Sequence, residues 1–274
     1  MPAMSMRFAK YEGLGNDFVI VDGDPELLAQ ARAQAVAICD RHRGVGADGV
    51  LLVSCAPELR MVVINADGSV PQMCGNGLRC VARHLVAVGA VQNTEFVVQT
   101  DAGPHRCKVL DDGRVEVDMR AATLEPASLP VRASAPIVDQ PFAFADKSVR
   151  MTAVSMGNPH AVIFDHSDAR LILGPAIAQS GMFPEGVNVG FAKVVQPGRL
   201  ELHVLERGAG WTQACGTGAC ACAVAAVLTG RAQRGEALTI VLPGGPLEIV
   251  VHEDGQPIVM TGPARHVFDG ALVS

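Results

Sequence analysis

Two stretches of small and aliphatic residues dominate the hydrophobic pattern of the chain, and each follows a Cys-Gly-x-Gly sequence. Residues 78–88 and 219–229 consist mainly of Ala, Val and Leu, and each stretch ends at a glycine, Gly89 or Gly230. Glycine in that place is typical of the residue just beyond a helix C-terminus. Apart from Arg79, Arg83 and His84 in the first stretch, neither has a clear polar face, so we predict one buried helix in each half of the chain, with a cysteine at its start.

Segments that alternate between apolar and polar residues surround these predicted helices. Residues 114–119 and 247–251 are rich in Val, Ile and Leu, and Asp-Gly pairs, which favour turns, lie close to both. The alternation indicates strands with one face toward a core. We therefore expect an α+β fold in which a mostly antiparallel or mixed sheet wraps around each central helix.

The same signals recur along the chain at a nearly constant separation. Asn16 and Asn158 each follow a glycine and lie 142 residues apart, and Cys74 and Cys215 lie 141 residues apart. So long a separation indicates two homologous domains and not the short period of a solenoid. We predict two lobes related by a pseudo-twofold axis. They comprise residues 1–120 and 121–264, with residues 265–274 returning to complete the first lobe.

Composition and charge narrow the classes of partner. The chain has 274 residues, is 49% apolar, and carries a net charge of −6 without a run of Lys or Arg. We therefore expect neither nucleic acid nor a membrane as a partner. The first residues lack the features of a signal peptide, with Met4 or Met6 as alternative start residues, and no segment has the roughly 18 apolar residues of a spanning helix. We expect a cytoplasmic protein.

The cysteines supply the candidate chemistry. There are eight of them and no Cys-x-x-Cys pair, a usage that indicates reduced thiols and predicts no metal site. Six are best interpreted as small buried residues. Cys74 and Cys215 differ, because they recur at two predicted helix starts, where free N–H donors lower a thiol pKa and attract a carboxylate. Two such thiols facing one ligand would be an acid and a base on opposite sides of a carbon, as racemisation requires.

A pyridoxal cofactor is the usual alternative for removing the α-hydrogen of an amino acid. The chain has four lysines, Lys10, Lys108, Lys147 and Lys193, and none lies in a glycine-rich phosphate-binding context. We therefore expect no cofactor, with donors at the two helix N-termini stabilising the charge that develops on the substrate.

The chain resembles the diaminopimelate epimerase family over nearly its whole length. The resemblance rests on an ordered set of motifs at residues 13–18 (GLGNDF), 44–49 (GVGADG), 65–68 (NADG), 73–80 (MCGNGLRC), 157–160 (GNPH), 186–188 (GVN), 206–208 (ERG) and 214–218 (ACGTG). It implies two lobes with a cleft between them, a homodimer, and cofactor-independent interconversion of LL- and meso-diaminopimelate in lysine and peptidoglycan precursor biosynthesis. Cys74 and Cys215 would be the catalytic thiols.

The resemblance also implies which residues bind the substrate diaminopimelate. The residues that would hold the reacting carboxylate follow the two cysteines and are Gly75, Asn76, Gly216 and Thr217. The residues that would read the distal amino-acid end are Asn16, Asn65, Asn158, Asn188 and Arg207. His160 and Glu206 would lie beside the reacting centre, contacting its ammonium group or supporting the thiols. Plainer interpretations remain open, since Asn beside Gly is common in turns and Glu206 with Arg207 reads equally as a surface ion pair.

Two positions depart from the family's pattern. Trp211 stands where the family often has Glu, and Gly49 stands where some members carry a Gln that contacts substrate. Neither position belongs to the cysteine motifs. We therefore expect these departures to alter fine substrate preference and not the thiol chemistry.

Two other functions fit the same fold. A proline or hydroxyproline racemase-like enzyme also uses two thiols, but its first motif typically reads Cys-Gly-His, whereas this chain has Asn76 in third place. A non-catalytic ligand-binding protein is the second alternative. Retention of both thiols together with Glu206 and Arg207 favours an enzyme.

Overall fold

The computed structural model describes residues 6–272 and divides the chain into two compact units, each treated by itself below. Unit 1 comprises Met1–Val117 and Thr261–Ser274, and unit 2 comprises Asp118–Met260. Of the two alternative start residues, Met4 lies outside the described residues, while Met6 opens the first strand.

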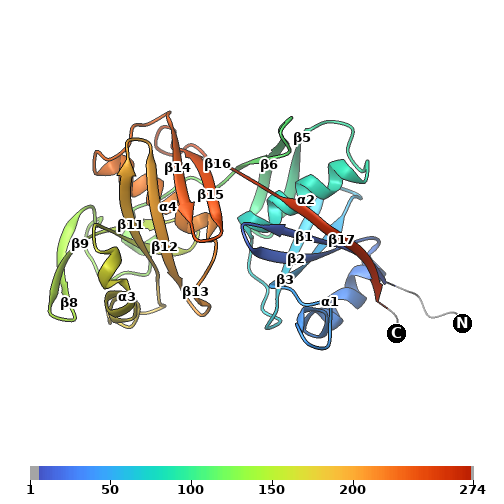
Figure 1. Cartoon of the computed structure of the whole chain (residues 1–274), viewed down its shortest axis with the longest axis horizontal. Coiled ribbons are helices and arrows are strands. Elements are labelled where there is room, and N and C mark those ends of the chain that lie inside the picture. Colours follow the sequence, from blue (N-terminus) through green and yellow to red (C-terminus); the bar gives the residue numbers. More distant parts are fainter. Residues whose placement is uncertain (1–5, 273–274) are drawn as a thin grey trace, which may run out of the picture. The chain divides into compact units, whose positions relative to one another are not determined.

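Unit 1 is a mixed sheet with two helices (Figure 1). Its elements are β1 (Met6–Gly13), β2 (Asn16–Asp22), α1 (Pro25–Cys39), β3 (Gly49–Ser54), β4 (Arg60–Asn65), α2 (Gly75–Ala87), β5 (Glu95–Thr100), β6 (Gly103–Val109), β7 (Val115–Asp118) and β17 (Arg265–Leu272). The strands pair in the order β17-β1-β2-β3-β4-β5-β6-β7. The pairs β2–β3 and β4–β5 are parallel, and the other pairs in this order are antiparallel.

Unit 2 repeats this arrangement with its own elements (Figure 1). They are β8 (Gln140–Phe144), β9 (Lys147–Ser155), β10 (Pro159–Phe164), α3 (Arg170–Ala178), β11 (Asn188–Gln196), β12 (Arg199–Glu206), β13 (Gly210–Trp211), α4 (Gly216–Leu228), β14 (Ala237–Leu242), β15 (Gly245–Val250), β16 (Val259–Gly262, which continues into unit 1) and the short 3₁₀ turns η1 (Pro126–Ser128) and η2 (Ser167–Ala169).

The pairings of unit 2 follow the same order of directions. The strands pair in the order β8-β9-β10-β11-β12-β14-β15. The pairs β10–β11 and β12–β14 are parallel, and the other pairs in this order are antiparallel. The predicted duplication is therefore visible as one topology used twice. The predicted mixture of antiparallel and parallel pairings is likewise present in each unit.

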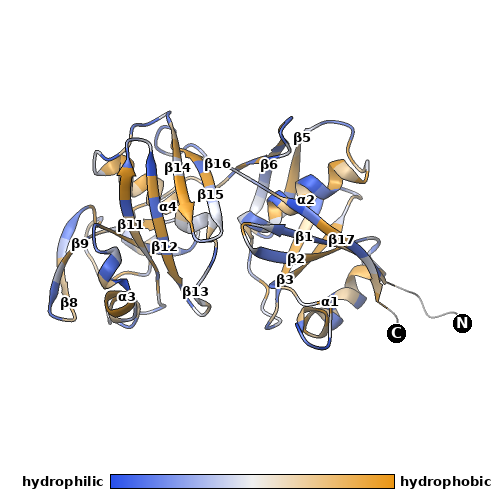
Figure 2. Cartoon of the chain, in the orientation of Figure 1, coloured by the Kyte–Doolittle hydropathy of each residue, from blue (hydrophilic) through white to orange (hydrophobic). Residues whose placement is uncertain are grey.

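The helices α2 and α4 occupy the equivalent central place in the two units. Each packs against most strands of its own sheet, and α4 is buried at every position from Gly218 to Ala226. Apolar colour also marks much of β14, one of the strands that pack against α4 (Figure 2). Both helices end as predicted, because Gly89 and Gly230, each with φ +71°, follow the last turn in a left-handed conformation that favours glycine.

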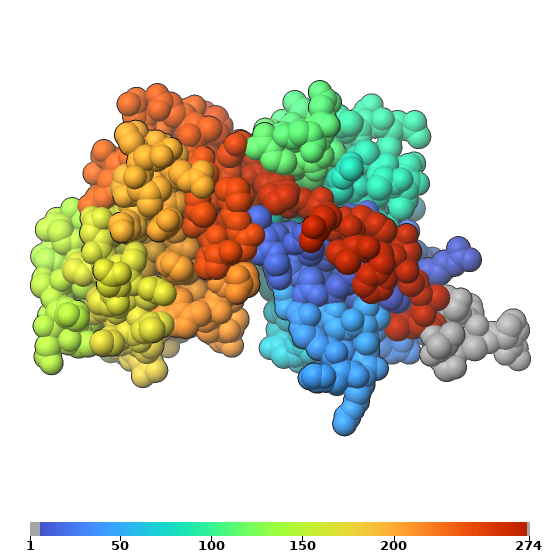
Figure 3. Space-filling view, viewed as in Figure 1, coloured from blue at the N-terminus to red at the C-terminus, as the bar shows by residue number. Residues whose placement is uncertain are grey.

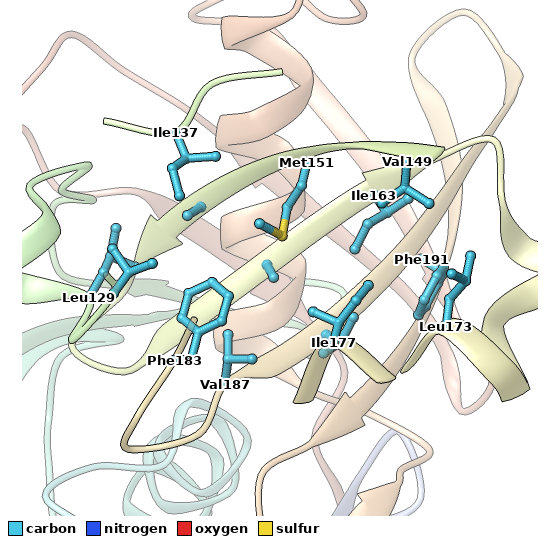
Figure 4. Close-up of a cluster of buried hydrophobic side chains, with 14 residues drawn as sticks. Leu129, Ile137, Val149, Met151, Ile163, Leu173, Ile177, Phe183, Val187 and Phe191 are labelled. Atoms are coloured by element: carbon cyan, nitrogen blue, oxygen red, sulfur yellow. The ribbon is translucent and has the colours of Figure 1, made fainter. Parts of the chain in front are cut away.

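A second helix in each unit, α1 or α3, was not predicted. The strands explain why one is needed: every residue of β10 is buried, and a strand in that state must be covered on both faces. In unit 2, Leu173 and Ile177 of α3 cover the sheet face opposite α4 and share a buried cluster with Met151 of β9 and Phe191 of β11 (Figure 4). The local signal for α1 was present, since the Asp24 side chain caps the N–H of Leu27 at 2.9 Å.

The proline-rich stretch after the predicted boundary at Arg120 is packed and is not a loose linker. Leu129, Val131 and Ile137 belong to the buried apolar cluster of unit 2 (Figure 4). Contacts divide the chain close to that boundary, between Val117 and Asp118.

The C-terminal strand β17 pairs with β1 and lies on the visible surface of unit 1, red beside blue in Figure 3. Its side chains are largely exposed, including Val267 at 49% and Phe268 at 44%. Within the described part of the chain, no helix is long and apolar enough to cross a membrane.

Candidate active site

Cys74 is the N-cap residue of α2. Its extended backbone (φ −137°, ψ 114°) places Sγ 3.4 Å from the backbone N of Gly77, which donates to the sulfur. A backbone donor at a helix N-terminus stabilises negative charge on its acceptor. The close packing depends on glycine, because a Cβ at Gly77 would lie 3.0 Å from Leu51 Cδ2.

Asn76, in the first turn of α2, is tied to the β1–β2 turn. Its Nδ2 donates to Asn16 Oδ1 at 3.2 Å, and Asn16 Nδ2 donates to Asp48 Oδ2 at 2.6 Å. Asp48 Oδ2 also accepts the backbone N–H of Asp17 at 3.0 Å, so this carboxylate fixes the Asn16 turn. Asn76 is 3% exposed, and its Oδ1 has no partner among the described residues, which leaves a buried acceptor for a ligand's donor.

Charged side chains bind Asp48 and the neighbouring Asp17. Arg41 donates to Asp48 Oδ1 at 2.6 Å and to Asp17 Oδ1 at 2.7 Å, and Lys10 Nζ lies 2.6 Å from Asp17 Oδ2. Burial alone would raise the pKa of Asp17, but hydrogen bonds from Arg41 and Lys10 outweigh it and lower the pKa to about 2. The Asp17 carboxylate therefore stays ionised at neutral pH and holds Arg41 in place beside Asp48.

Asn65 ends β4 at the same edge of the sheet. It faces Gly49 in the strand register, and the next residue, Ala66, donates its N–H to the Asp48 carbonyl at 3.0 Å. Its own amide donates to Ser69 Oγ at 2.9 Å and not to Asn16 or Asn76. Asn65 thus lies near the cluster without joining its hydrogen-bond chain.

Cys215 is the N-cap residue of α4 and has the same backbone conformation as Cys74 (φ −132°, ψ 102°). Here the equivalent backbone N–H, that of Gly218, completes no capping hydrogen bond, although it acts to lower the pKa of the thiol, and Thr217 Oγ1 lies 3.6 Å from the sulfur. Burial raises the pKa of the Cys215 thiol well above its usual range, and the negative charge of Glu206 raises it further, against the opposing effect of Thr217. The resting Cys215 is therefore a protonated thiol.

Glu206 stands at the end of β12, directly before Arg207. Its Oε1 accepts the hydroxyl of Thr212 at 2.5 Å. Thr212 lies on the segment that leads from β13 to Cys215, so this bond ties the carboxylate to the start of α4. A carboxylate held next to a thiol can accept its proton or contact a substrate ammonium group.

His160 and Asn158 extend the polar cluster of unit 2. His160 Nε2 lies 3.1 Å from Asn158 Oδ1, and Asn158 Nδ2 donates to Thr217 Oγ1 at 3.4 Å. His160 is 1% exposed, and burial together with the charge of Arg207 lowers its pKa to about 3. The imidazole is therefore neutral at physiological pH.

Arg207 is held by hydrogen bonds to two neighbours, Glu185 and Asn188. Its guanidinium donates to the Glu185 carbonyl at 2.7 Å and its backbone N–H to Asn188 Oδ1 at 2.9 Å, while Asn188 Nδ2 donates to the Pro159 carbonyl at 2.9 Å. Gly186 (φ +78°) leaves room for the Arg207 side chain, because a Cβ there would be 2.8 Å from Arg207 Cδ. A pocket of about 310 Å³ within unit 2 is lined by Glu206 and Arg207, a volume near the lower limit for ligand pockets.

The two positions that depart from the family's pattern have clear surroundings. A side chain at Gly49 would collide with its own sheet, since a Cβ would lie 2.8 Å from the Ile64 carbonyl oxygen. Trp211 packs against Phe191 with ring centroids 6.2 Å apart and against Gly174 of α3, where a Cβ would lie 3.1 Å from Trp211 Cζ2. Trp211 thus covers α3 of its own unit.

The structure gathers most of the predicted site residues into two hydrogen-bonded clusters. In unit 1, Asn16 and Asn76 join at the α2 start beside Cys74 and Gly75; in unit 2, Asn158, His160, Glu206 and Thr217 surround Cys215 and Gly216, with Asn188 holding Arg207. Sequence reasoning missed Asp48, Arg41, Thr212 and Gly186. Asp48 and Gly186 lie inside motifs that had been noted, but their roles depend on partners far along the chain. No group of three or more His, Cys, Asp or Glu side chains in residues 6–272 could hold a metal ion.

Comparison with known proteins adds independent findings. The sequence model of the family described as diaminopimelate epimerase matches residues 8–125 and 152–267. A diaminopimelate epimerase from Desulforudis audaxviator is 48% identical over 278 residues, covering 98% of this chain and 99% of that protein. Another from Synechococcus elongatus is 44% identical over 282 residues, with 98% and 99% covered. A solved hydroxyproline epimerase from Agrobacterium vitis has a TM-score of 0.69 at 14% identity, covering 98% of this chain and 92% of that one, a likeness of fold alone.

Proposed function

This chain belongs to the diaminopimelate epimerase family, and from that premise we propose that it interconverts LL- and meso-diaminopimelate without a cofactor, with Cys74 and Cys215 as the paired base and acid. The predicted family and the isomerase class are confirmed, and the chain serves lysine biosynthesis. The single observation that best supports the proposed chemistry is that a cysteine caps each of the two central helices, inside a cluster of buried polar side chains.

The reaction uses the two thiols in opposite protonation states. The sulfur of Cys74 accepts the Gly77 N–H and takes the α-hydrogen as the base, while the protonated Cys215 delivers its proton to the opposite face. One C–H bond breaks and another forms, and the electron pair rests in between on the α-carbon and its carboxylate. The reverse reaction exchanges the roles, so each sulfur must serve as base in one direction.

The helix starts also suit the substrate's reacting carboxylate. Gly75 and Asn76 follow Cys74, and Gly216 and Thr217 follow Cys215, so each helix offers first-turn N–H groups beside its thiol. Donors of this kind stabilise the negative charge that grows on the carboxylate as the α-hydrogen leaves. The buried Oδ1 of Asn76 is an acceptor that suits the α-ammonium group.

The distal amino-acid end is assigned to the amides and to Arg207. Arginine binds a carboxylate through two parallel N–H bonds, and an Asn amide can both donate and accept. Arg207 lies on the wall of the pocket in unit 2 beside Glu206. Asn65 and Asn188 add amides at the ends of β4 and β11.

A proline racemase-like activity is the rival at the level of substrate. Identity of 48% over the full chain favours diaminopimelate, whereas the likeness to a hydroxyproline epimerase is one of fold. Incubation in D₂O with LL-diaminopimelate, proline and trans-4-hydroxyproline separates them. We expect deuterium at the α-carbon of diaminopimelate alone, and exchange confined to proline or hydroxyproline would refute the proposal.

We also propose that the protein is a cytoplasmic homodimer. All eight cysteines are free thiols, which suits a reducing compartment. Exposed Val267 and Phe268 on β17 offer an apolar surface to a second copy. Sedimentation velocity on the wild type and on Phe268→Glu tests the assembly, and a monomeric wild type would refute it.

A further inference from the structure

The polar side chains next to the two cysteines form hydrogen-bond chains that run in opposite directions. In unit 1, Asn76 donates to Asn16, and Asn16 donates to Asp48, so the chain leads away from the helix start. In unit 2, Asn158 donates to Thr217. That chain leads toward the helix start and ends beside the Cys215 sulfur.

The direction in unit 2 follows from what each group can donate. A carbonyl oxygen only accepts, so the contact between His160 Nε2 and Asn158 Oδ1 requires a proton on Nε2. That bond turns the NH₂ group of Asn158 toward Thr217 Oγ1. The hydroxyl, having accepted one bond from the amide, keeps its own hydrogen free for another partner.

The free hydrogen of Thr217 has the Cys215 sulfur within reach. Sγ and Oγ1 lie 3.6 Å apart, and Thr217 acts to lower the pKa of Cys215 while burial and Glu206 raise it. The Gly218 N–H also acts to lower that pKa but completes no capping hydrogen bond to the sulfur, in contrast to unit 1. There the Gly77 N–H caps the Cys74 sulfur directly, and the residue in the place of Thr217 is Asn76, which faces Asn16.

We propose that His160, Asn158 and Thr217 form a one-way hydrogen-bond chain that aims the Thr217 hydroxyl at Cys215, and that this hydroxyl stabilises the Cys215 thiolate in the direction of turnover where Cys215 is the base. His160 and Asn158 are then positioning residues, and the Thr217 side chain serves the sulfur and not the substrate. The mechanistic role rests on the proposed function of Cys215, while the hydrogen-bond chain itself does not.

Thr217→Val, which removes the hydroxyl at nearly constant volume, is the central test. Thr217→Ser keeps the hydroxyl and should retain the wild-type behaviour of Cys215. Thr229→Val is the matched control, because it makes the same change in α4 at the far end of the helix, where Thr229 bonds the Ala225 carbonyl. Asn158→Asp replaces the donor by an acceptor and should pull the hydroxyl away from the sulfur.

The first readout needs no substrate. Modification of Cys215 by methyl methanethiosulfonate is followed against pH by peptide mass spectrometry, with Cys74 in the same sample as reference. We expect Thr217→Val and Asn158→Asp to move the titration of Cys215 upward by about one pH unit, the size of one hydrogen bond to a charged group. Thr217→Ser, Thr229→Val and the Cys74 reference should match the wild type.

The second readout is the pH dependence of epimerisation. A higher Cys215 pKa keeps the form with Cys74 ionised and Cys215 protonated to higher pH, so the alkaline limb of kcat/KM should move upward in Thr217→Val, with kcat about tenfold lower and KM unchanged. An unshifted Cys215 titration and an unshifted alkaline limb, with a raised KM, would overturn the proposal and make Thr217 a substrate contact. Absence of diaminopimelate turnover by the wild type would instead refute the proposed function. The pH profile of Cys215 modification would still show whether the hydrogen-bond chain acts on the sulfur.

Discussion

Replacing Gly186 by Ala should selectively weaken substrate binding by displacing Arg207. At φ +78° an alanine pays about 1–2 kcal/mol of backbone strain. Its Cβ would lie 2.8 Å from Arg207 Cδ and 3.2 Å from Cγ. The Arg207 side chain must therefore move, which weakens its 2.7 Å hydrogen bond to the Glu185 carbonyl. Because Arg207 is assigned to the distal carboxylate, we expect KM for diaminopimelate to rise about tenfold or more, as for a lost charge-assisted bond, with a smaller change in kcat.

Gly198→Ala is the matched control for backbone strain. Gly198 also has a positive φ of +73°, but no atom lies within 4 Å of the place its Cβ would take. Both variants should lose roughly 2–8 °C of Tm, because the strain term is shared. Steady-state kinetics and thermal unfolding on the two proteins then separate strain from the displacement of Arg207. Equal KM values for Gly186→Ala and Gly198→Ala would show that the position of the Arg207 side chain does not affect substrate binding.

Four further outcomes are expected. Cys74→Ala and Cys215→Ala should each lower kcat for epimerisation by roughly 10²- to 10⁴-fold, the usual contribution of an acid or base, as measured by chiral chromatography. Lysine, which lacks the distal carboxylate, should have kcat/KM roughly 10⁴-fold below diaminopimelate, and comparable values would contradict the distal assignment. Asp48→Ala should lower kcat/KM about tenfold by releasing Asn16, whereas Asp101→Ala, in an exposed ion pair with Arg60, should not. Because the pKa of His160 falls from 6.5 to about 3 on folding, stability should decline as pH drops from 6.5 toward 3, and urea unfolding of His160→Gln should show a shallower decline.

The starts and ends of α2 and α4 could be predicted because they depend on local chemistry. A cysteine before Gly-x-Gly and a glycine beyond the last turn fix each helix within a few residues, whatever packs against it. The second helix of each unit depends instead on the sheet. Leu173 and Ile177 have their place because β9, β10 and β11 need a cover on the face opposite α4, and only the assembled sheet creates that need.

The supporting residues of the site were beyond sequence reasoning for a similar cause. Asp48 acts on Asn16, which lies 32 positions earlier, and Gly186 acts on Arg207 through the absence of a side chain. Neither relation leaves a periodic or compositional trace in one sequence. The two thiols and Arg207 could be predicted, whereas the residues that hold the site in place, such as Asp48 and Gly186, depend on contacts that exist only in the folded chain.

The two copies of the motif solve one electrostatic problem in different ways. A reversible epimerase needs both sulfurs to hold a negative charge in turn. Cys74 meets that need with a backbone donor, which leaves residue 76 free to be an asparagine with a buried acceptor. Cys215 is more deeply buried and faces Glu206, so its thiolate is costlier, and the hydroxyl of Thr217, at the position equivalent to Asn76, adds to the effect of the Gly218 N–H in lowering its pKa. The difference between Asn and Thr at this one position thus follows from the unequal surroundings of the two thiols, and exchanging the two residues should impair the thiolate of Cys215 without providing a new donor to that of Cys74.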